Sequence, residues 1–234
     1  MGPDQCGAPR RTVLFDLDGT LVDSVDDLVT AANVVLVPRG LPRAARPEVT
    51  ALVGNGVRVL LAGLFANRDA TLSEAALAEF QTYYAAHAAV ETRPFPGIRE
   101  ALQILAQSGW GLTVCTNKPE AAARALLAEL DLLRWFAAVG AGDSFPVRKP
   151  DPAHLLSTLE AAGGNADGAI MVGDHLNDVS AALGAGLPCI FAAWGYGDPA
   201  MSAGATAIAQ TVAELPELCE RLAPVWPADP SRAA

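Results

Sequence analysis

Short apolar segments alternate with amphipathic, alanine-rich segments along most of the chain. Six apolar segments, most of them rich in β-branched residues, predict strands at residues 12–15, 111–115, 137–140, 169–172, 188–192 and 205–209. Five amphipathic segments predict helices at 98–107, 119–130, 152–162, 176–183 and 212–222. Because such alternation produces a parallel sheet with helices on both faces, we predict an α/β, doubly wound, Rossmann-like core.

The alternation is interrupted once, between the first and the second predicted strand. Residues 23–93 contain helical patterns at 26–36, 57–65 and 73–89 and no convincing strand. The cluster Pro94-Phe95-Pro96-Gly97 marks the return to the core. We therefore predict an α/β core from residues 11–22 and 94–223, an inserted all-helical cap domain at 23–93, and tails at 1–10 and 224–234, of which the second is expected to fray.

Composition limits the classes of partner. The chain has 234 residues, of which 51% are hydrophobic, enough for one large domain or a domain with an insert. With 16 basic and 26 acidic side chains its net charge is −10, which argues against a nucleic acid or an acidic membrane as partner. The longest uninterrupted apolar run, Cys189 to Trp194, has six residues, whereas a membrane span needs about 20. Because no secretory signal is visible, we expect a cytoplasmic protein. We expect it to be a monomer or a homodimer.

Two residue types are unusual in their distribution. Four cysteines lack the spacing of a metal site or of a disulfide framework and are expected to be reduced thiols: Cys6, Cys115, Cys189 and Cys219. The 16 basic residues comprise 14 arginines and only two lysines. Because arginine is otherwise the basic residue of this chain, the presence of lysine at Lys118 and at Lys149 needs a specific explanation.

Polar residues directly follow four of the predicted strands. They are Asp16-Leu17-Asp18-Gly19-Thr20, Thr116-Asn117-Lys118, Arg148-Lys149-Pro150-Asp151, and the segment from Gly173-Asp174 to Asp178. In an open α/β sheet, ligands bind outside the carboxyl ends of the strands. We therefore expect carboxylates, hydroxyls and both lysines to converge on one rim of the core.

The residue types on this rim suit phosphoryl chemistry. Asp16 and Asp18 are two residues apart at a strand end and can face the same side. Together with Asp174 and Asp178 they form an oxygen-only ligand set, which suits Mg²⁺. One carboxylate can then attack phosphorus while the other moves a proton. Lys149 would neutralise the charge of the phosphoryl group.

Two neighbouring polar groups complete the predicted site, because Thr116 offers a hydroxyl and Asn117 an amide to a phosphoryl oxygen. Each segment taken singly also has a plainer interpretation. Paired aspartates form turns, Asp174 or Thr116-Asn117 can cap helices, and Lys149 can be a solvated lysine. A calcium loop beginning at Asp16 is excluded, because its sixth position is Leu21 in place of glycine. Four segments in order, each at a strand end, favour one functional site.

The stretch Phe15-Asp16-Leu17-Asp18-Gly19-Thr20-Leu21-Val22-Asp23-Ser24 resembles the first motif of the haloacid dehalogenase superfamily of phosphotransferases. Thr116 resembles the second motif, Lys149 the third, and Gly173-Asp174 to Asp178 the fourth, so the resemblance runs from about residue 11 to 223. It implies that Asp16 is a nucleophile that becomes an aspartyl phosphate. It also implies that Asp18 is first the general acid and then the base. Mg²⁺ would be held by Asp16, the main-chain carbonyl of Asp18 and Asp174, with Asp178 in support.

Three further segments resemble the phosphoglycolate phosphatase group of that superfamily: Val53-Gly54-Asn55-Gly56-Val57, Thr116-Asn117-Lys118-Pro119 and Trp194-Gly195-Tyr196-Gly197. The glycine-flanked loop that opens a helix would present main-chain N–H groups to a substrate carboxylate. Arg58 either adds charge there or is simply solvated. The resemblance implies a Mg²⁺-dependent phosphomonoester hydrolase that converts 2-phosphoglycolate to glycolate and phosphate. A phosphatase for another small phosphate, such as a sugar phosphate, and a phosphomutase of the same family are the alternatives.

The sequence departs from this pattern at His175, where Ser or Thr is more usual. Because Mg²⁺ prefers oxygen ligands, we expect His175 to lie beside the metal site without binding the ion. A dehalogenase is disfavoured, because that branch lacks the second aspartate, here Asp18. A phosphoacceptor signalling module is disfavoured too. It would have two adjacent acidic residues at the end of the first strand and a phosphorylated aspartate at the end of the third, neither of which is seen, and it would have no helical insert.

Overall fold

The computed structural model describes residues 11–223, and the six predicted strands all form there. They are β1 (Thr12–Phe15), β4 (Gly111–Cys115), β5 (Ala138–Gly140), β6 (Ala169–Gly173), β7 (Cys189–Ala192) and β8 (Ala207–Ala209). They make one parallel sheet in the order β5-β4-β1-β6-β7-β8. Connections run outward from β1 in both directions, so a crevice opens at the carboxyl end of β1. The predicted doubly wound α/β fold is confirmed.

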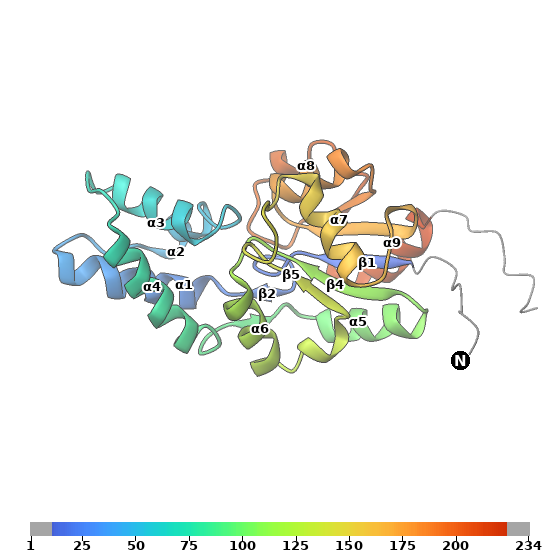
Figure 1. Cartoon of the computed structure of the whole chain (residues 1–234), viewed down its shortest axis with the longest axis horizontal. Coiled ribbons are helices and arrows are strands. Elements are labelled where there is room, and N and C mark those ends of the chain that lie inside the picture. Colours follow the sequence, from blue (N-terminus) through green and yellow to red (C-terminus); the bar gives the residue numbers. More distant parts are fainter. Residues whose placement is uncertain (1–10, 224–234) are drawn as a thin grey trace, which may run out of the picture.

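Helices cover both faces of this sheet (Figure 1). One face carries α5 (Ile98–Gln107), α6 (Glu120–Glu129) and α9 (Leu215–Leu222), and the other carries α7 (Pro152–Ala161) and α8 (Leu176–Ala185). Side chains of β1 alternate between the two cores, with Val13 and Phe15 in one and Leu14 in the other. Because β1 is covered on both faces, all its residues are buried, which explains its continuous apolar sequence.

Four helices between β1 and α5 form a separate unit, called here the helical lobe. They are α1 (Val25–Leu36), α2 (Arg46–Thr50), α3 (Val57–Ala66) and α4 (Glu74–His87). They pack around a hydrophobic core of their own, which includes Leu61, Leu64 and Phe80. The helical lobe lies beyond the carboxyl ends of the strands (Figure 1), where the sequence places its polar residues. A lobe in this position faces the predicted site.

The connection between the core and the helical lobe differs from the prediction. Strands β2 (Val22–Asp23) and β3 (Arg93–Pro94) form an antiparallel ribbon in which Asp23 pairs with Arg93. The chain thus enters and leaves the helical lobe side by side. A strand of two residues contains no alternation, so the sequence pattern cannot reveal it. The short helix α2 was not predicted either, and residues 212–214 form a 3₁₀ turn ahead of α9.

The cysteines and the tails were also assigned from the sequence. The tails at 1–10 and 224–234, with Cys6, lie outside the described residues. Cys115, Cys189 and Cys219 are buried free thiols, as predicted. Between residues 11 and 223, none of the helices combines the length and the apolar character that crossing a membrane requires.

Candidate active site

The end of β1 places Asp16 at the centre of the rim. The Asp16 main-chain N–H donates to the carbonyl oxygen of Val172 in β6 (2.9 Å), so the ladder of β1 continues one residue beyond the strand. Gly19 then turns the chain with φ +87°. A Cβ on Gly19 would lie 2.3 Å from Oδ2 of Asp174. Only glycine allows this approach, so the loop after β1 can pack against the segment after β6.

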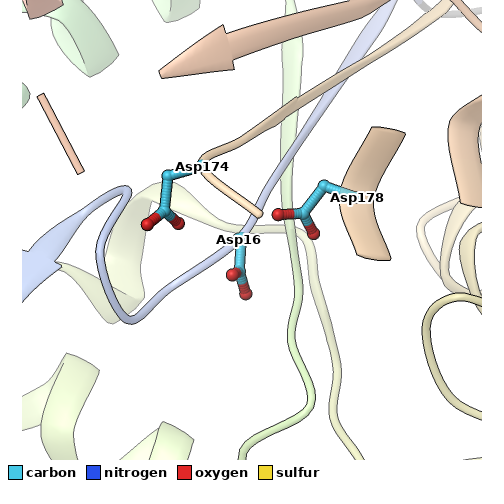
Figure 2. A group of neighbouring side chains, drawn as sticks. All are labelled: Asp16, Asp174 and Asp178. Carbon is cyan, nitrogen blue, oxygen red and sulfur yellow. The ribbon is translucent and has the colours of Figure 1, made fainter. Parts of the chain in front are cut away.

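Three buried carboxylates meet at this point. Asp16, Asp174 and Asp178 each offer an oxygen atom, and these atoms all lie within 4.8 Å of one another. Figure 2 shows the carboxylate of Asp16 between the other two, which come from the segment after β6 and from α8. Burial, together with the charges of Asp16 and Asp178, raises the pKa of Asp174 to about 8. Burial raises the pKa of Asp178 to about 6, although Lys149 opposes the rise.

Lys149 is the cation of this cluster. Its Nζ lies 2.9 Å from Oδ1 of Asp16 and 2.6 Å from Oδ1 of Asp178. Burial acts to lower the pKa of Lys149, but Asp16 and Asp178 outweigh it and the pKa is raised. One ammonium group against three carboxylates leaves an excess of negative charge. An oxygen-only donor set with that excess fits a divalent cation.

Two groups that the sequence analysis assigned no role orient Asp174. The Thr20 hydroxyl donates to Oδ1 of Asp174 (3.0 Å), and the Tyr196 main-chain N–H donates to Oδ2 (2.7 Å). The Tyr196 hydroxyl donates to Asp23 in the ribbon (2.7 Å). Tyr196 therefore connects the carboxylate cluster to the start of the helical lobe.

The Asp18 side chain lies outside the carboxylate cluster and has its own cation. Lys118 Nζ donates to both carboxylate oxygens of Asp18 (3.0 and 3.1 Å) and to the hydroxyl of Tyr84 on α4 (2.6 Å). The Ser24 hydroxyl donates to Oδ1 of Asp18 (2.6 Å). Burial acts to lower the pKa of Lys118, but Asp18 and Tyr84 outweigh it and the pKa is raised. A charged, buried lysine thus joins the core to the helical lobe.

Thr116 and Asn117 follow β4, as predicted, and both are buried at the rim. The Thr116 hydroxyl oxygen accepts from the main-chain N–H of Lys118 (3.2 Å). Asn117 Nδ2 donates to the carbonyl oxygens of Lys149 and Gly54, both at 2.9 Å. Its Oδ1 has no partner among residues 11–223. Both amide hydrogens of Asn117 therefore hold protein segments together.

The loop Gly54-Asn55-Gly56 of the helical lobe docks on the core. Asn177 on α8 donates from Nδ2 to the Gly54 carbonyl oxygen (3.1 Å) and to Oδ1 of Asn55 (2.9 Å). Gly56, with φ +85°, is the N-cap residue that precedes α3. Arg58, two residues further on, forms an exposed ion pair with Glu74 (2.6 Å) and does not line either cavity described below. The structure thus brings Gly54, Asn55 and Gly56 to the site, whereas Arg58 faces solvent.

Adding a methyl group at Gly54 tests this docking. A Cβ there would lie 2.7 Å from the ring of His175, so we expect Gly54→Ala to raise KM for a phosphate ester roughly tenfold by holding the loop off the core. Gly40→Ala is the matched control, because Gly40 also has a positive φ (+71°) but has nothing within 4 Å of the added Cβ. KM and the melting temperature of both variants check this. Equal KM values in the two variants would contradict it.

His175 caps helix α8. The Nδ1 atom of His175 accepts from the main-chain N–H of Asn177 (3.1 Å), and the main-chain N–H of His175 donates to Oδ2 of Asp178 (3.0 Å). These two hydrogen bonds between His175 and the first turn of α8 form a capping box, in which an imidazole nitrogen takes the place of a Ser or Thr hydroxyl. Burial lowers the pKa of His175, which favours the neutral ring that can accept. The expected position beside the cluster therefore has a structural reason.

His154 accepts a hydrogen bond from the main chain of Lys149. The Lys149 main-chain N–H donates to Nδ1 of His154 (3.2 Å), and Nε2 of His154 lies 3.0 Å from the carbonyl oxygen of Ala141. This network assigns the proton to Nε2 and requires a neutral ring. Burial and the charge of Lys149 lower the pKa of His154 to about 4.

This lowered pKa makes stability depend on pH. Between about pH 6.5 and 4 the unfolded chain binds a proton at His154 that the native chain does not, so the free energy of unfolding falls as pH decreases through this window. We expect a loss of about 2 kcal/mol from this residue between pH 7 and pH 5. Urea unfolding at both pH values, compared with His154→Gln, isolates the effect. A variant with the same pH dependence as the unchanged protein would contradict it.

Two cavities touch Asp18 where the helical lobe meets the core. The smaller, of about 40 Å³, is lined by Asp16, Asp18, Thr116 and Lys118 and by apolar side chains of the helical lobe. The larger, of about 480 Å³, lies on the side of Asp174 and His175 and includes Arg46. The candidate nucleophile and the candidate acid thus line one small cavity.

The chain is similar to known proteins in sequence and in fold. A family model described as haloacid dehalogenase-like hydrolase matches residues 10–186. A protein of Agrobacterium fabrum named phosphoglycolate phosphatase is 46% identical over 192 residues, covering 80% of this chain and 82% of that protein. One of the same name from Caulobacter vibrioides is 38% identical over 222 residues, covering 93% and 94%. The crystal structure of a predicted phosphoglycolate phosphatase from Haemophilus somnus superposes with a TM-score of 0.83 at 29% identity, covering 89% and 97% of the two chains.

Proposed function

Because the chain belongs to the haloacid dehalogenase-like hydrolase family, we propose that it hydrolyses 2-phosphoglycolate to glycolate and phosphate through a phosphoryl group carried by Asp16. The observation that carries this proposal is the arrangement at the end of β1. Asp16 contacts Lys149 and lies in a cluster of carboxylates, while Asp18 lines the same small cavity beside a second lysine. With two carboxylates at one cavity, Asp16 can be the nucleophile while Asp18 acts as acid and base.

In the first half of the reaction, an oxygen of Asp16 attacks phosphorus and the bond from phosphorus to the ester oxygen breaks. Asp18 donates a proton to that oxygen, and glycolate leaves. Lys149, already in contact with Asp16, offsets the charge that gathers on the phosphoryl oxygens, and the Thr116 hydroxyl can donate to one of them.

In the second half, Asp18 takes a proton from a water molecule, which attacks the same phosphorus. The bond from phosphorus to Asp16 then breaks and inorganic phosphate leaves, with Asp16 again a carboxylate and Asp18 again protonated. The position of Asp18, 14% exposed at its side chain and bordering both cavities, is compatible with contact to either the leaving group or water.

The fit of the carboxylate cluster to a divalent cation extends to Mg²⁺, which we propose as the cofactor. Asp16, Asp174 and the main-chain carbonyl of Asp18 would hold the ion, with Asp178 in support. When bound, Mg²⁺ supplies positive charge that reduces the repulsion between an anionic phosphoryl group and the carboxylates. The residues' own part is to bind that ion and to hold Asp16 in line with phosphorus.

The choice of 2-phosphoglycolate rests on the relatives named phosphoglycolate phosphatase and on the small cavity at Asp18. We propose that residues 23–93, which contain the helical lobe, are a cap that closes over the substrate and excludes water. The enzyme would act in the cytoplasm on a small metabolite.

The test is phosphate release from a panel of phosphate esters, with Mg²⁺ and with EDTA. The panel includes 2-phosphoglycolate, sugar phosphates and a pair of interconvertible phosphosugars. The proposal expects metal-dependent release with a clear preference for 2-phosphoglycolate. Metal-dependent release with another favourite would overturn the substrate while leaving the chemistry of Asp16 in place. Interconversion of phosphosugars with little free phosphate would identify a mutase.

A further inference from the structure

Lys118 is the buried cation whose position the reaction steps above leave unexplained. Its side chain is 2% exposed, and it lines the small cavity together with Asp16, Asp18 and Thr116. Among the described residues it is the only Lys or Arg that lines this cavity. Burying an ammonium group is costly unless it has anionic or polar partners, and here those partners are Asp18 and Tyr84.

One hydrogen bond of Lys118 can be exchanged for a bond to a further anion. An ammonium group has three donors, of which one points to the Tyr84 hydroxyl and the others serve the two oxygens of Asp18. Either Asp18 oxygen could give up its bond while the other keeps the pair intact. Asp18 also accepts from Ser24, so its position does not depend on Lys118 alone.

The shape of the proposed substrate brings a carboxylate to this ammonium group. In 2-phosphoglycolate, a single methylene separates the carboxylate from the ester oxygen. When Asp18 contacts that oxygen, the substrate carboxylate must lie close to Asp18 itself. Two carboxylates so close together need a cation between them, and Lys118 already touches Asp18.

Arg46 is the competing cation, because it lines the larger cavity beside Asp18. Its side chain is 44% exposed and already pairs with Asp23 (2.8 Å) and Asp26 (2.5 Å). An exposed guanidinium with two carboxylates discriminates weakly, since water screens it, whereas a buried ammonium interacts strongly. The Gly56 end of α3 adds main-chain N–H groups on the side of Lys118, since Gly56 and Val57 line the same small cavity.

We propose that Lys118 is the specificity-determining residue that binds the substrate carboxylate, giving up one bond to Asp18 while Tyr84 keeps the ammonium in place. This inference rests on the proposed function, because it assumes a carboxylate next to the ester oxygen. It explains why the chain uses a lysine here, since a compact group with rotatable donors can serve two carboxylates at once.

The experiment compares kcat/KM for 2-phosphoglycolate with that for 2-hydroxyethyl phosphate, in which a neutral CH₂OH replaces the carboxylate. The unchanged enzyme is expected to prefer 2-phosphoglycolate. In Lys118→Met that preference should fall roughly 10- to 100-fold, the effect of losing a charge-assisted bond. Arg46→Met should keep the preference within about threefold, because its exposed guanidinium is screened by water. Lys118→Gln provides the same comparison if Lys118→Met does not fold.

Two outcomes overturn the inference. If Lys118→Met lowers kcat/KM for both esters by the same factor, Lys118 acts only on Asp18 or on the fold. If Arg46→Met removes the preference, the guanidinium binds the carboxylate. The failure of the proposed function is distinguishable, because the unchanged enzyme would then show no preference for 2-phosphoglycolate over the neutral ester.

Discussion

Asp16→Asn is expected to lower kcat by roughly 10⁴-fold or more, because an amide cannot accept the phosphoryl group as a carboxylate does. The protein should remain folded. The substitution removes the charge that Lys149 contacts, but it also removes repulsion between Asp16 and the carboxylates of Asp174 and Asp178. We therefore expect a melting temperature no lower than that of the unchanged protein. Phosphate release and thermal unfolding measure the two effects.

The matched control for this change is Asp151→Asn. Asp151 lies two residues beyond Lys149, is exposed and caps α7, and asparagine caps helices equally well. Turnover in Asp151→Asn should equal that of the unchanged enzyme. Turnover in Asp16→Asn at a level similar to the control would contradict the role of Asp16.

Binding of Mg²⁺ is expected to stabilise the protein and to be lost in Asp174→Asn. Without an ion, three buried carboxylates face one ammonium group, and Asp174 has a pKa raised to about 8. At an ion concentration a hundredfold above Kd, binding adds about 2.7 kcal/mol to the free energy of unfolding. For a chain of this size that is a rise of roughly 5–10 °C in melting temperature. EDTA should abolish both this rise and phosphate release.

Thermal unfolding with EDTA and with increasing Mg²⁺ measures this effect without relying on activity. Asp174→Asn should show little or no rise, whereas Asp151→Asn should show the full one. If Mg²⁺ shifts Asp174→Asn as much as the unchanged protein, the ion binds elsewhere. If it shifts neither, the cluster does not bind Mg²⁺.

The sheet and its rim could be predicted because each strand carries a strong local pattern. The strand 12–15 is a continuous apolar run, since both of its faces are covered, and Asp16 follows it directly. The rule that ligands bind at the carboxyl ends of parallel strands then places Asp16, Thr116 and Asp174 together. The ribbon of β2 and β3 could not be predicted, because strands of two residues have no periodicity and the paired segments lie far apart in the sequence.

Contacts between the core and the helical lobe were the part of the site that the sequence did not reveal. Tyr84 carries no signal, since a tyrosine on an amphipathic helix is usually a core residue, yet its hydroxyl meets Lys118. The scarcity of lysine marked Lys118 as unusual without assigning it a partner. For Arg58 the sequence left open whether it adds charge at the site or is solvated. The structure shows it in an exposed ion pair with Glu74, the first residue of α4.

Mass spectrometry of acid-quenched Asp18→Asn, after mixing with 2-phosphoglycolate and Mg²⁺, tests directly whether Asp16 carries the phosphoryl group. Loss of the base at Asp18 should slow both the formation and the hydrolysis of the phosphoryl-enzyme, and a phosphoryl group should be trapped. We expect one added phosphoryl group, on the peptide that contains Asp16, and none in Asp16→Asn. Phosphate release by the unchanged enzyme with no modified Asp16 under any quench time, or modification of a different residue, would contradict it.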